Sequence, residues 1–325
     1  MPFDERRANA KTLAMSTLGI VAGLSTAVLW TLTAVCFEAA MRRIGSLSVN
    51  VLRLLVAAVL FVGLSVWRTG SVLPQNLSVA MWRDLSISGL VGFVAGDLML
   101  FHAFVLLGGR LAMLIYASVP TMTAIAGLLF LGEHISARGV LGMVVTTAGI
   151  GVSVMGKREA SANVAASRRL GVLLAIGGSA GQAAGLLLGK RGSATLDAFA
   201  ATEVRVLAGL GGFILVAVLS QRLTKIASVV ALALGTQRPE NGARIRSARV
   251  ALVTLTAGAF FGPFLGVSLG LLSAQLLPAG IASTLMSIVP ALMIPVAALV
   301  FRERVTRIEV TGTLVALCGV GLLAH

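Results

Sequence analysis

The chain has 325 residues, of which 57% are hydrophobic and only 12% are charged, and its formal net charge is +14. About a quarter of the residues of a soluble domain are charged, so this composition excludes a soluble globular protein and indicates one covered by lipid. The positive charge does not indicate nucleic acid, because most Lys and Arg residues fall between apolar stretches, where they orient helices and meet lipid headgroups.

Ten apolar windows of membrane-spanning length follow an N-terminal tail of residues 1–13. The first five lie at about 14–37, 48–67, 85–107, 111–131 and 138–155. After a polar linker at 157–169, the others lie at about 170–189, 198–220, 250–272, 279–301 and 308–324. We predict a helix in each, since about 20 apolar residues cross the hydrocarbon core and an open sheet would leave its backbone unpaired in lipid. The predicted fold is an all-α integral membrane protein with ten transmembrane helices, multi-pass in the cell (inner) membrane.

The two halves of the chain repeat a pattern of glycine, proline and polar residues. Three shifts relate them: 152 residues for Gly19/Gly171, Trp30/Gln182 and Arg53/Arg205, 166 for Gly96/Gly262, and 170 for Pro120/Pro290 and Gly149/Gly319. Because the shift changes only between helices, we predict two five-helix repeats over 14–156 and 170–325. Five is odd, so the second repeat enters the membrane inverted. Inverted repeats place a binding site near the bilayer midplane and permit alternating access.

Several motifs in this frame identify a family. They are Trp30 in the first helix, Arg53 in the second, and Val119–Pro120 and Leu131–Gly132–Glu133 in the fourth. In order and spacing they resemble the EamA-type transporters of the drug/metabolite transporter superfamily, over nearly the whole chain. The resemblance implies secondary transport of small metabolites, often export of amino acids or related solutes, with both termini cytoplasmic. It also implies that helices 1–4 and 6–9 surround a cavity and that helices 5 and 10 are peripheral.

The segment between helices 7 and 8 and the distribution of charge depart from this pattern. The 27-residue stretch from Gln221 to Ser247 is longer and more basic than its counterpart between helices 2 and 3. With the N-terminus inside, cytoplasmic segments hold eight Lys and Arg residues and the opposite side sixteen, which the positive-inside rule would reverse. The first half alone favours the N-terminus inside, so we retain cytoplasmic termini. A dip of Leu223–Gly235 into the membrane is an alternative, although 13 residues are too few to span it.

Asp97 is the outstanding ionisable residue, because it lies near the middle of the third predicted helix, in GFVAGDLMLFHAF. Charged groups at membrane depth are costly and usually mark a transport pathway or an internal pair. We interpret it either as a carboxylate that couples transport to protons or binds a substrate ammonium, or as a structural partner of a buried arginine. If Arg53 pairs with Asp97, the carboxylate stays charged and its role is structural.

Arg53 and Arg205 occupy equivalent positions, about two turns inside helices 2 and 7. Either is a candidate to hold a substrate carboxylate, since a guanidinium binds that group through two parallel hydrogen bonds. The structural alternatives are snorkelling to the interface or pairing with a protein carboxylate. Glu203 is two residues from Arg205, and residues two apart on a helix do not face each other.

The other candidates for the cavity are polar or aromatic side chains in the predicted spans: Trp30, Gln182, His102, Tyr116, Ser283 and Ser287. Trp30 and Gln182 are related by the repeat, and ordinary helix packing is the alternative for both. His102 follows Asp97 by five residues, about 140° around the helix, so the two form no obvious proton relay. A packed histidine is the alternative there.

Proline and glycine indicate how the helices pack. Four prolines are predicted to break or kink helices and free backbone groups that line a cavity: Pro120, Pro263, Pro290 and Pro295. Glycine recurs every four residues in two helices: Gly177, Gly181, Gly185 and Gly189 in helix 6, and Gly258, Gly262, Gly266 and Gly270 in helix 8. Because such stripes let helices approach closely, we expect helices 6 and 8 to cross along them.

The function that these patterns favour is secondary transport of small metabolites such as amino acids or amphiphilic solutes, as an exporter. A membrane-embedded enzyme acting on a lipid-like substrate is the alternative, but the chain has only three His and no cluster of acids, bases or metal ligands. We expect no cofactor and no metal. The expected partners are a small-molecule substrate and the lipid bilayer, with a homodimer as one oligomeric form and no nucleic acid.

Overall fold

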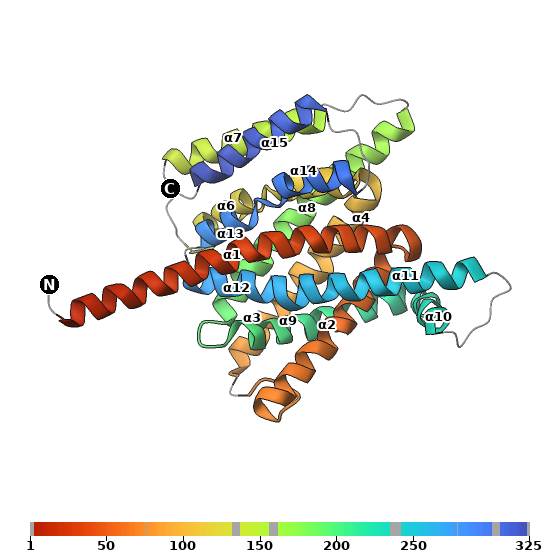
Figure 1. Cartoon of the computed structure of the whole chain (residues 1–325), viewed down its shortest axis with the longest axis horizontal. Coiled ribbons are helices and arrows are strands. Elements are labelled where there is room, and N and C mark those ends of the chain that lie inside the picture. The colour runs from red at the N-terminus through yellow and green to blue at the C-terminus, as the bar shows by residue number, and fades with distance from the viewer. Residues whose placement is uncertain are drawn as a thin grey trace.

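The computed structural model describes residues 3–75, 77–131, 137–155, 162–234, 242–277, 279–300 and 306–323, and all regular structure in these ranges is helical (Figure 1). The first half contains α1 (Phe3–Ile44), α2 (Ser46–Thr69), α3 (Val79–Gly89), the π-helix η1 (Leu90–Gly96), α4 (Asp97–Leu107), α5 (Gly109–Tyr116), α6 (Val119–Leu131) and α7 (Ala137–Met155). The second half contains α8 (Ala162–Gly192), α9 (Ala198–Leu219), α10 (Leu223–Leu234), α11 (Gly242–Ala259), the π-helix η2 (Phe260–Gly266), α12 (Val267–Leu276), α13 (Ala279–Met286), α14 (Val289–Leu299) and α15 (Arg307–Leu323). The residues predicted as a tail are helical from Phe3 onward and continue into α1.

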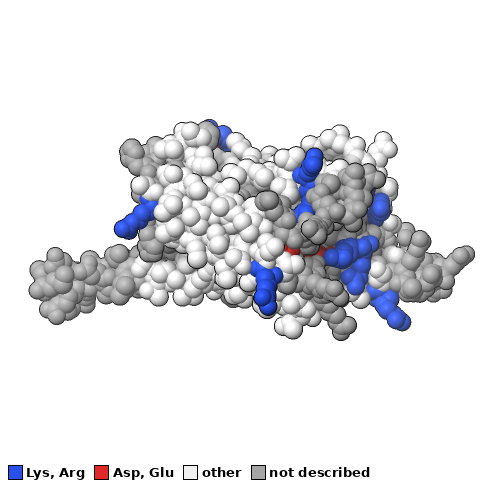
Figure 2. Space-filling model, turned by 90° about the horizontal axis from the view of Figure 1, so that it is seen from above, with Lys and Arg blue, Asp and Glu red and all other residues white. Residues whose placement is uncertain are grey.

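The prediction of an all-helical membrane protein is confirmed. Within the described residues, six continuous helical stretches are long and apolar enough to cross a bilayer: Met15–Ile44, Ser46–Thr69, Val79–Leu107, Ala166–Gly192, Ala198–Leu219 and Ile245–Leu276. Shorter apolar helices accompany them. Many large apolar side chains on these helices are exposed, Val59 and Val253 among them, as expected of a surface that faces lipid. In the view of Figure 2 the surface is mostly uncharged, and the visible Lys and Arg side chains lie mainly toward the right-hand end.

Two of the predicted spans are each divided into two helices. The windows at 111–131 and 279–301 are interrupted after Tyr116 and after Met286, four residues before Pro120 and Pro290. A proline clashes with the carbonyl group four residues earlier and donates no hydrogen bond, which explains why both helices stop there. Pro263 lies inside η2 and Pro295 inside α14. Glu133, Glu303 and residues 157–161 of the predicted linker lie outside the described residues, whereas residues 162–169 form the beginning of α8.

The first helix of each half packs on the π-helix of the other half. A methyl group on Gly96 of η1 would lie 3.3 Å from the backbone nitrogen of Gln182 in α8, and one on Gly266 of η2 would lie 2.9 Å from the indole nitrogen of Trp30 in α1. Thus α8 packs on η1 as α1 packs on η2. The predicted match of Gly96 with Gly262, at a shift of 166, is wrong by about one turn. The structure pairs η1 with η2 at a shift of 170, which also holds for the later helices.

The segment that carries α10 explains why the sequence shift between equivalent residues of the two halves rises from 152 before it to 170 after it. It lies between α9 and α11, and the Nε atom of Arg249 in α11 donates a hydrogen bond to the carbonyl oxygen of Ala233 in α10, at 3.2 Å. At 12 residues, α10 is too short to span a bilayer. The insertion therefore adds a short helix against the end of α11 and leaves the register of the other helices unchanged.

The glycine stripes pack on partners other than those predicted. We expected helices 6 and 8 to cross along them. Instead, Gly181 and Gly185 of α8 face Gly96 and Gly92 of η1, and Gly262 of η2 faces Thr33 of α1. The prediction was wrong because each stripe in the second half meets a helix of the first half, and the sequence of one stripe does not name its partner.

Gly185 provides a test of this close approach. A methyl group there would lie 2.8 Å from the Cα atom of Gly92, whereas one on Gly211 of α9 would meet nothing within 4 Å. We expect Gly185→Ala to lower the free energy of unfolding by about 1–3 kcal/mol, as overpacking does. Gly211→Ala should leave it unchanged or raise it, since alanine favours helix. Denaturant unfolding in detergent measures both, and equal effects would contradict the proposed contact.

Helices α7 and α15 lie side by side at one edge of the molecule (Figure 1). Gly149 of α7 faces Ala316 of α15, and Gly319 of α15 faces Thr146 of α7, again an exchange of equivalent contacts. The central volume is left to α1 to α6 and to their counterparts in the second half, and buried polar residues such as Arg53 and Asp97 lie there.

Candidate functional site

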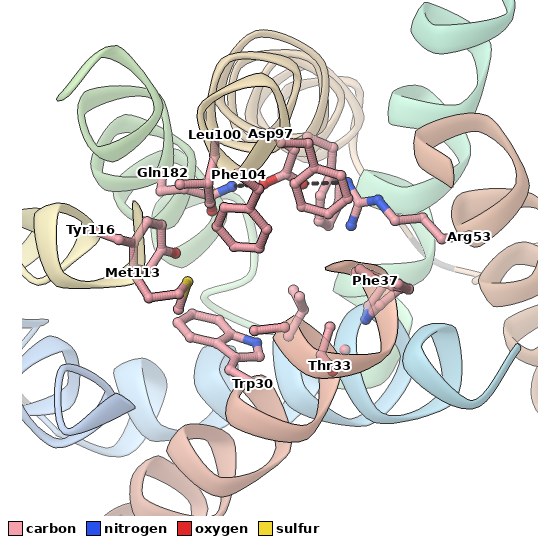
Figure 3. A pocket seen from close by; sticks show the side chains of 16 residues that line it. Trp30, Thr33, Phe37, Arg53, Asp97, Leu100, Phe104, Met113, Tyr116 and Gln182 are labelled. Atoms are coloured by element: carbon pink, nitrogen blue, oxygen red, sulfur yellow. Dashed lines mark hydrogen bonds and ion pairs between the residues drawn. The ribbon is translucent and has the colours of Figure 1, made fainter. Parts of the chain in front are cut away.

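A cavity of about 70 Å³ lies where the two halves meet, and most of its wall is apolar or aromatic (Figure 3). Its lining comes from α1, α2, η1, α4, α5, α8, η2 and α12: Trp30, Thr33, Ala34, Phe37, Arg53, Phe93, Asp97, Leu100, Phe101, Phe104, Met113, Tyr116, Gln182, Gly262, Pro263 and Val267. The space takes only a few water molecules, since roughly 10–15 Å³ of such volume holds one.

Asp97 is the centre of a buried hydrogen-bond network. The Nη2 atom of Arg53 donates to one carboxylate oxygen of Asp97, and the two side chains are only 4% and 8% exposed. The amide of Gln182 donates to the other carboxylate oxygen at 2.5 Å and to the carbonyl oxygen of Gly92 at 3.1 Å. The Nε atom of Arg53 donates to Asn50 at 3.0 Å. Both oxygens of the carboxylate and two sides of the guanidinium are therefore occupied.

Aromatic rings surround the Arg53 guanidinium. Its central carbon lies 4.6 Å from the ring centroid of Phe101, 5.7 Å from that of Phe37 and 5.9 Å from that of Phe93. A cation over an aromatic face is attracted by the ring quadrupole, more strongly when water is excluded. Arg53 is thus held by a carboxylate, an amide oxygen and three rings.

A second cavity of about 40 Å³ adjoins the first and contains Arg205. It is lined by Trp30, Tyr116, Val119, Gln182, Leu186, Arg205, Val267, Gly270, Leu271, Ser283, Met286 and Ser287. Trp30 and Tyr116, whose rings meet edge to face at 5.9 Å, line both cavities and so lie between them.

Arg205 is buried but is not held as Arg53 is. It is 3% exposed, and its Nε atom has no hydrogen-bond partner among the described residues. The central carbon of its guanidinium lies 5.4 Å from the ring centroid of Phe93, the ring that also approaches Arg53. The two arginines that the repeat makes equivalent thus have different surroundings.

The structure brings together eight of the nine side chains that the sequence suggested for the site. Asp97, Arg53, Trp30, Gln182 and Tyr116 line the first cavity, and Arg205, Ser283 and Ser287 line the second. His102 is the exception. It is exposed, and it lines a separate hollow with Arg222 and Lys225, where α1 ends and α2 begins. Of the predicted kink residues, Pro263 borders the first cavity.

Comparison with known proteins places this arrangement in a family. The model of the EamA-like transporter family matches residues 17–155 and again residues 169–324. The chain belongs to the EamA-like transporter family. Among solved structures, one protein crystal structure superposes with a TM-score of 0.62 over 94% of this chain and 95% of its own, at 14% sequence identity, which shows a shared fold. No curated protein matches the chain in sequence.

As an EamA-family protein, the chain is a multi-pass membrane transporter that moves a small molecule by secondary transport, and it is not an enzyme. The predicted resemblance is confirmed. The alternative of a membrane-embedded enzyme on a lipid-like substrate is overturned by the two family matches, which cover both halves of the chain.

The sequence analysis missed other buried carboxylates in this EamA-family protein. Glu203 of α9 is 1% exposed and accepts a hydrogen bond from the hydroxyl of Ser65, in a hollow of about 510 Å³ apart from the central cavities. Glu38 of α1 accepts from the backbone N–H of Gly109 at 3.1 Å and pairs with Arg42 at 2.7 Å. Glu203 lies near the start of the predicted span 198–220 and Glu38 just beyond the end of the span 14–37, so neither has the mid-span position that singled out Asp97.

Proposed function

We propose that this EamA-family protein exports small amphiphilic or zwitterionic metabolites, such as amino acids, through the two adjoining central cavities. The observation that supports this is a buried polar cluster at the junction of the halves, within walls that are otherwise apolar and aromatic. Asp97, Arg53 and Gln182 form it, with Arg205 beside them. Ligand sites are usually of this kind: mostly apolar, with a few placed polar groups.

Alternating access between inverted repeats is the mechanism that we propose. In Figure 1, α1 runs from left to right and α8 from right to left, as an inverted relation requires. The exchanged contacts, α8 on η1 and α1 on η2, support a two-fold relation between the halves. A first cavity of about 70 Å³ is too small for an amino acid, so the halves must separate on one side to admit a substrate. The interruptions before Pro120 and Pro290 are positions at which α5–α6 and α13–α14 can bend.

Both termini are proposed to be cytoplasmic. The beginning of α1 and the end of α15 lie toward the same side in Figure 1, which agrees with an even number of crossings. The more basic right-hand end in Figure 2 is the opposite one, so the positive-inside rule still opposes this orientation. A reporter fused to the C-terminus and active only outside the cytoplasm would be expected to stay silent, and its activity would reverse the assignment.

A homodimer stays a prediction, which the mass of the detergent-solubilised protein tests.

Transport is tested by flux in proteoliposomes. We expect counterflow of radiolabelled leucine and competition by a panel of amino acids, measured with and without a pH gradient. An amino-acid methyl ester and an aliphatic amine are tested beside them as compounds that lack the carboxylate. Two controls are used: protein-free liposomes, and protein whose two halves are cross-linked through introduced cysteines so that it cannot leave the inward-facing state. Flux of a class outside the panel, with none of the panel competing, would contradict the proposed substrate.

A further inference from the structure

We propose that Arg205, in the second cavity, is the subsite that binds the carboxylate group of the substrate. The inference rests on the proposed function and goes beyond it by assigning one chemical group of the substrate to one side chain. The site comprises Arg205 of α9, Gln182 of α8, Tyr116 of α5, Ser283 of α13 and Ser287, which directly follows α13. The elements that contribute it come from both halves of the chain.

The buried charges of the two cavities do not balance. Arg53 and Arg205 are equivalent by the repeat, but among the described residues only Arg53 forms an ion pair with Asp97, which attracts Arg205 only through space. At the shift of 170 that relates η1 to η2, the counterpart of Asp97 is Val267, so the second half supplies no acid where the first half does. Glu203 cannot replace it, because it bonds to Ser65 in a different hollow. The two central cavities therefore hold two guanidinium groups and one carboxylate.

A buried charge without a partner is costly, and it persists where function requires it. Arg205 is 3% exposed and borders the second cavity, and its Nε atom has no hydrogen-bond partner among the described residues. The ring of Phe93 lies 5.4 Å from the guanidinium carbon but supplies no hydrogen-bond acceptor. The missing acceptor is the one that a bound anion would bring.

The surroundings favour a carboxylate over a larger or more highly charged anion. One unmatched positive charge is balanced by one negative charge, whereas a phosphate brings nearly two. The planar guanidinium also matches a carboxylate with two parallel hydrogen bonds. The hydroxyl group of Tyr116 also lines this cavity and is a donor that such an anion accepts, whereas the hydroxyl of Ser287 donates to the carbonyl oxygen of Ser283. A cavity of about 40 Å³ has room for a group of this size and little more.

This assignment also orients the substrate. Trp30 and Tyr116 lie between the two cavities, and the first cavity is lined by Phe37, Phe101 and Phe104. With its carboxylate on Arg205, a substrate would place its apolar part past Trp30 into that aromatic space. Asp97 and Arg53, which line only the first cavity, would then lie on the side away from the bound carboxylate.

The site is tested first by binding, without transport. Acetate is the probe, acetamide its neutral equivalent in shape, and the unfolding temperature of the purified protein is followed in detergent at constant ionic strength. We expect acetate to raise the unfolding temperature in a saturable way and acetamide to have no effect. In Arg205→Gln the affinity for acetate should fall about tenfold or more, as the loss of a charge-assisted bond predicts. Arg205→Lys keeps the charge but loses the planar pair of N–H donors, so its affinity for acetate should lie between those of the wild type and Arg205→Gln.

Arg68→Gln is the matched control, because Arg68 is half-exposed and pairs with Asp197 away from both cavities. It should keep the wild-type response to acetate. An absent response in the wild type, an equal response to acetamide, or an unchanged acetate affinity in Arg205→Gln would each overturn the subsite. If Arg205→Gln does not fold, the acetate affinity of Arg205→Lys is compared with that of the wild type instead, and an unchanged affinity would likewise overturn the subsite.

A flux experiment separates this inference from the proposed function. In proteoliposomes, leucine should compete for transport and its methyl ester, which lacks the carboxylate, should not. Arg205→Gln should remove this preference. Selective acetate binding with no leucine flux would reject the transported class and keep the subsite. Leucine flux with equal competition by the methyl ester would keep the transporter and reject the subsite.

Discussion

Arg53→Gln is expected to destabilise the protein, whereas Arg205→Gln is expected to leave the free energy of unfolding unchanged or to raise it. The two arginines occupy equivalent positions, are 4% and 3% exposed, and contact the same ring of Phe93. They differ in their partners. Removing Arg53 leaves the carboxylate of Asp97 buried without its ion-pair partner, which typically costs about 3–5 kcal/mol. Removing Arg205 takes away a charge that forms no ion pair among the described residues and that Asp97 attracts only through space.

The measurement is denaturant unfolding of both variants in the same detergent, without any carboxylate buffer. The wild type should gain stability from acetate and Arg205→Gln should not, so the order of stability can invert when acetate is added. Equal destabilisation by the two substitutions would show that Arg205 is held by the protein itself. That result would also remove the charge argument for an anion subsite.

The sequence determined the class of fold and the frame of the site because both depend on strong, local patterns. Apolar windows of spanning length gave the helices, and the second window of each half placed Arg53 and Arg205 at matching depth. The breaks before Pro120 and Pro290 follow from the backbone chemistry of proline. These features need no knowledge of which helices touch.

The partners could not be predicted, because they depend on contacts between distant helices. The glycine stripe of α8 predicted a close neighbour, and only the structure shows that this neighbour is η1. The same contact corrects the register: one helical turn separates a match of Gly96 to Gly262 from a match to Gly266, and glycine occurs at both positions. With the corrected register, Asp97 corresponds to Val267, and the asymmetry of charge between the halves becomes visible.

The role of Asp97 was left conditional on whether a cation lies nearby, and Arg53 does. A carboxylate that accepts from a guanidinium and an amide is well placed to fix the positions of both donors. We therefore propose Asp97 as a positioning residue that holds Arg53 and Gln182 in the wall of the first cavity. This interpretation differs from proton coupling in what it predicts for stability and for the effect of a pH gradient.

Asp97→Asn should lower the free energy of unfolding by about 3–5 kcal/mol, because the guanidinium of Arg53 then stays buried without a counter-charge. The double variant Asp97→Asn with Arg53→Gln removes both charges and should be more stable than the sum of the two single effects predicts. A double-mutant cycle in detergent measures this, and an interaction energy of about 1–3 kcal/mol is expected for a contacting pair. Additive effects would mean that the two side chains do not act as a pair.

The same variant distinguishes positioning from proton coupling when flux is measured. If Asp97 only holds the wall in place, Asp97→Asn should reduce flux in proportion to the loss of folded protein, and the ratio of flux with and without a pH gradient should match that of the wild type. Asparagine keeps the shape of the side chain and one acceptor oxygen but cannot exchange a proton. A variant that stays as stable as the wild type and transports leucine without any response to the pH gradient would contradict the positioning role and assign the coupling proton to Asp97.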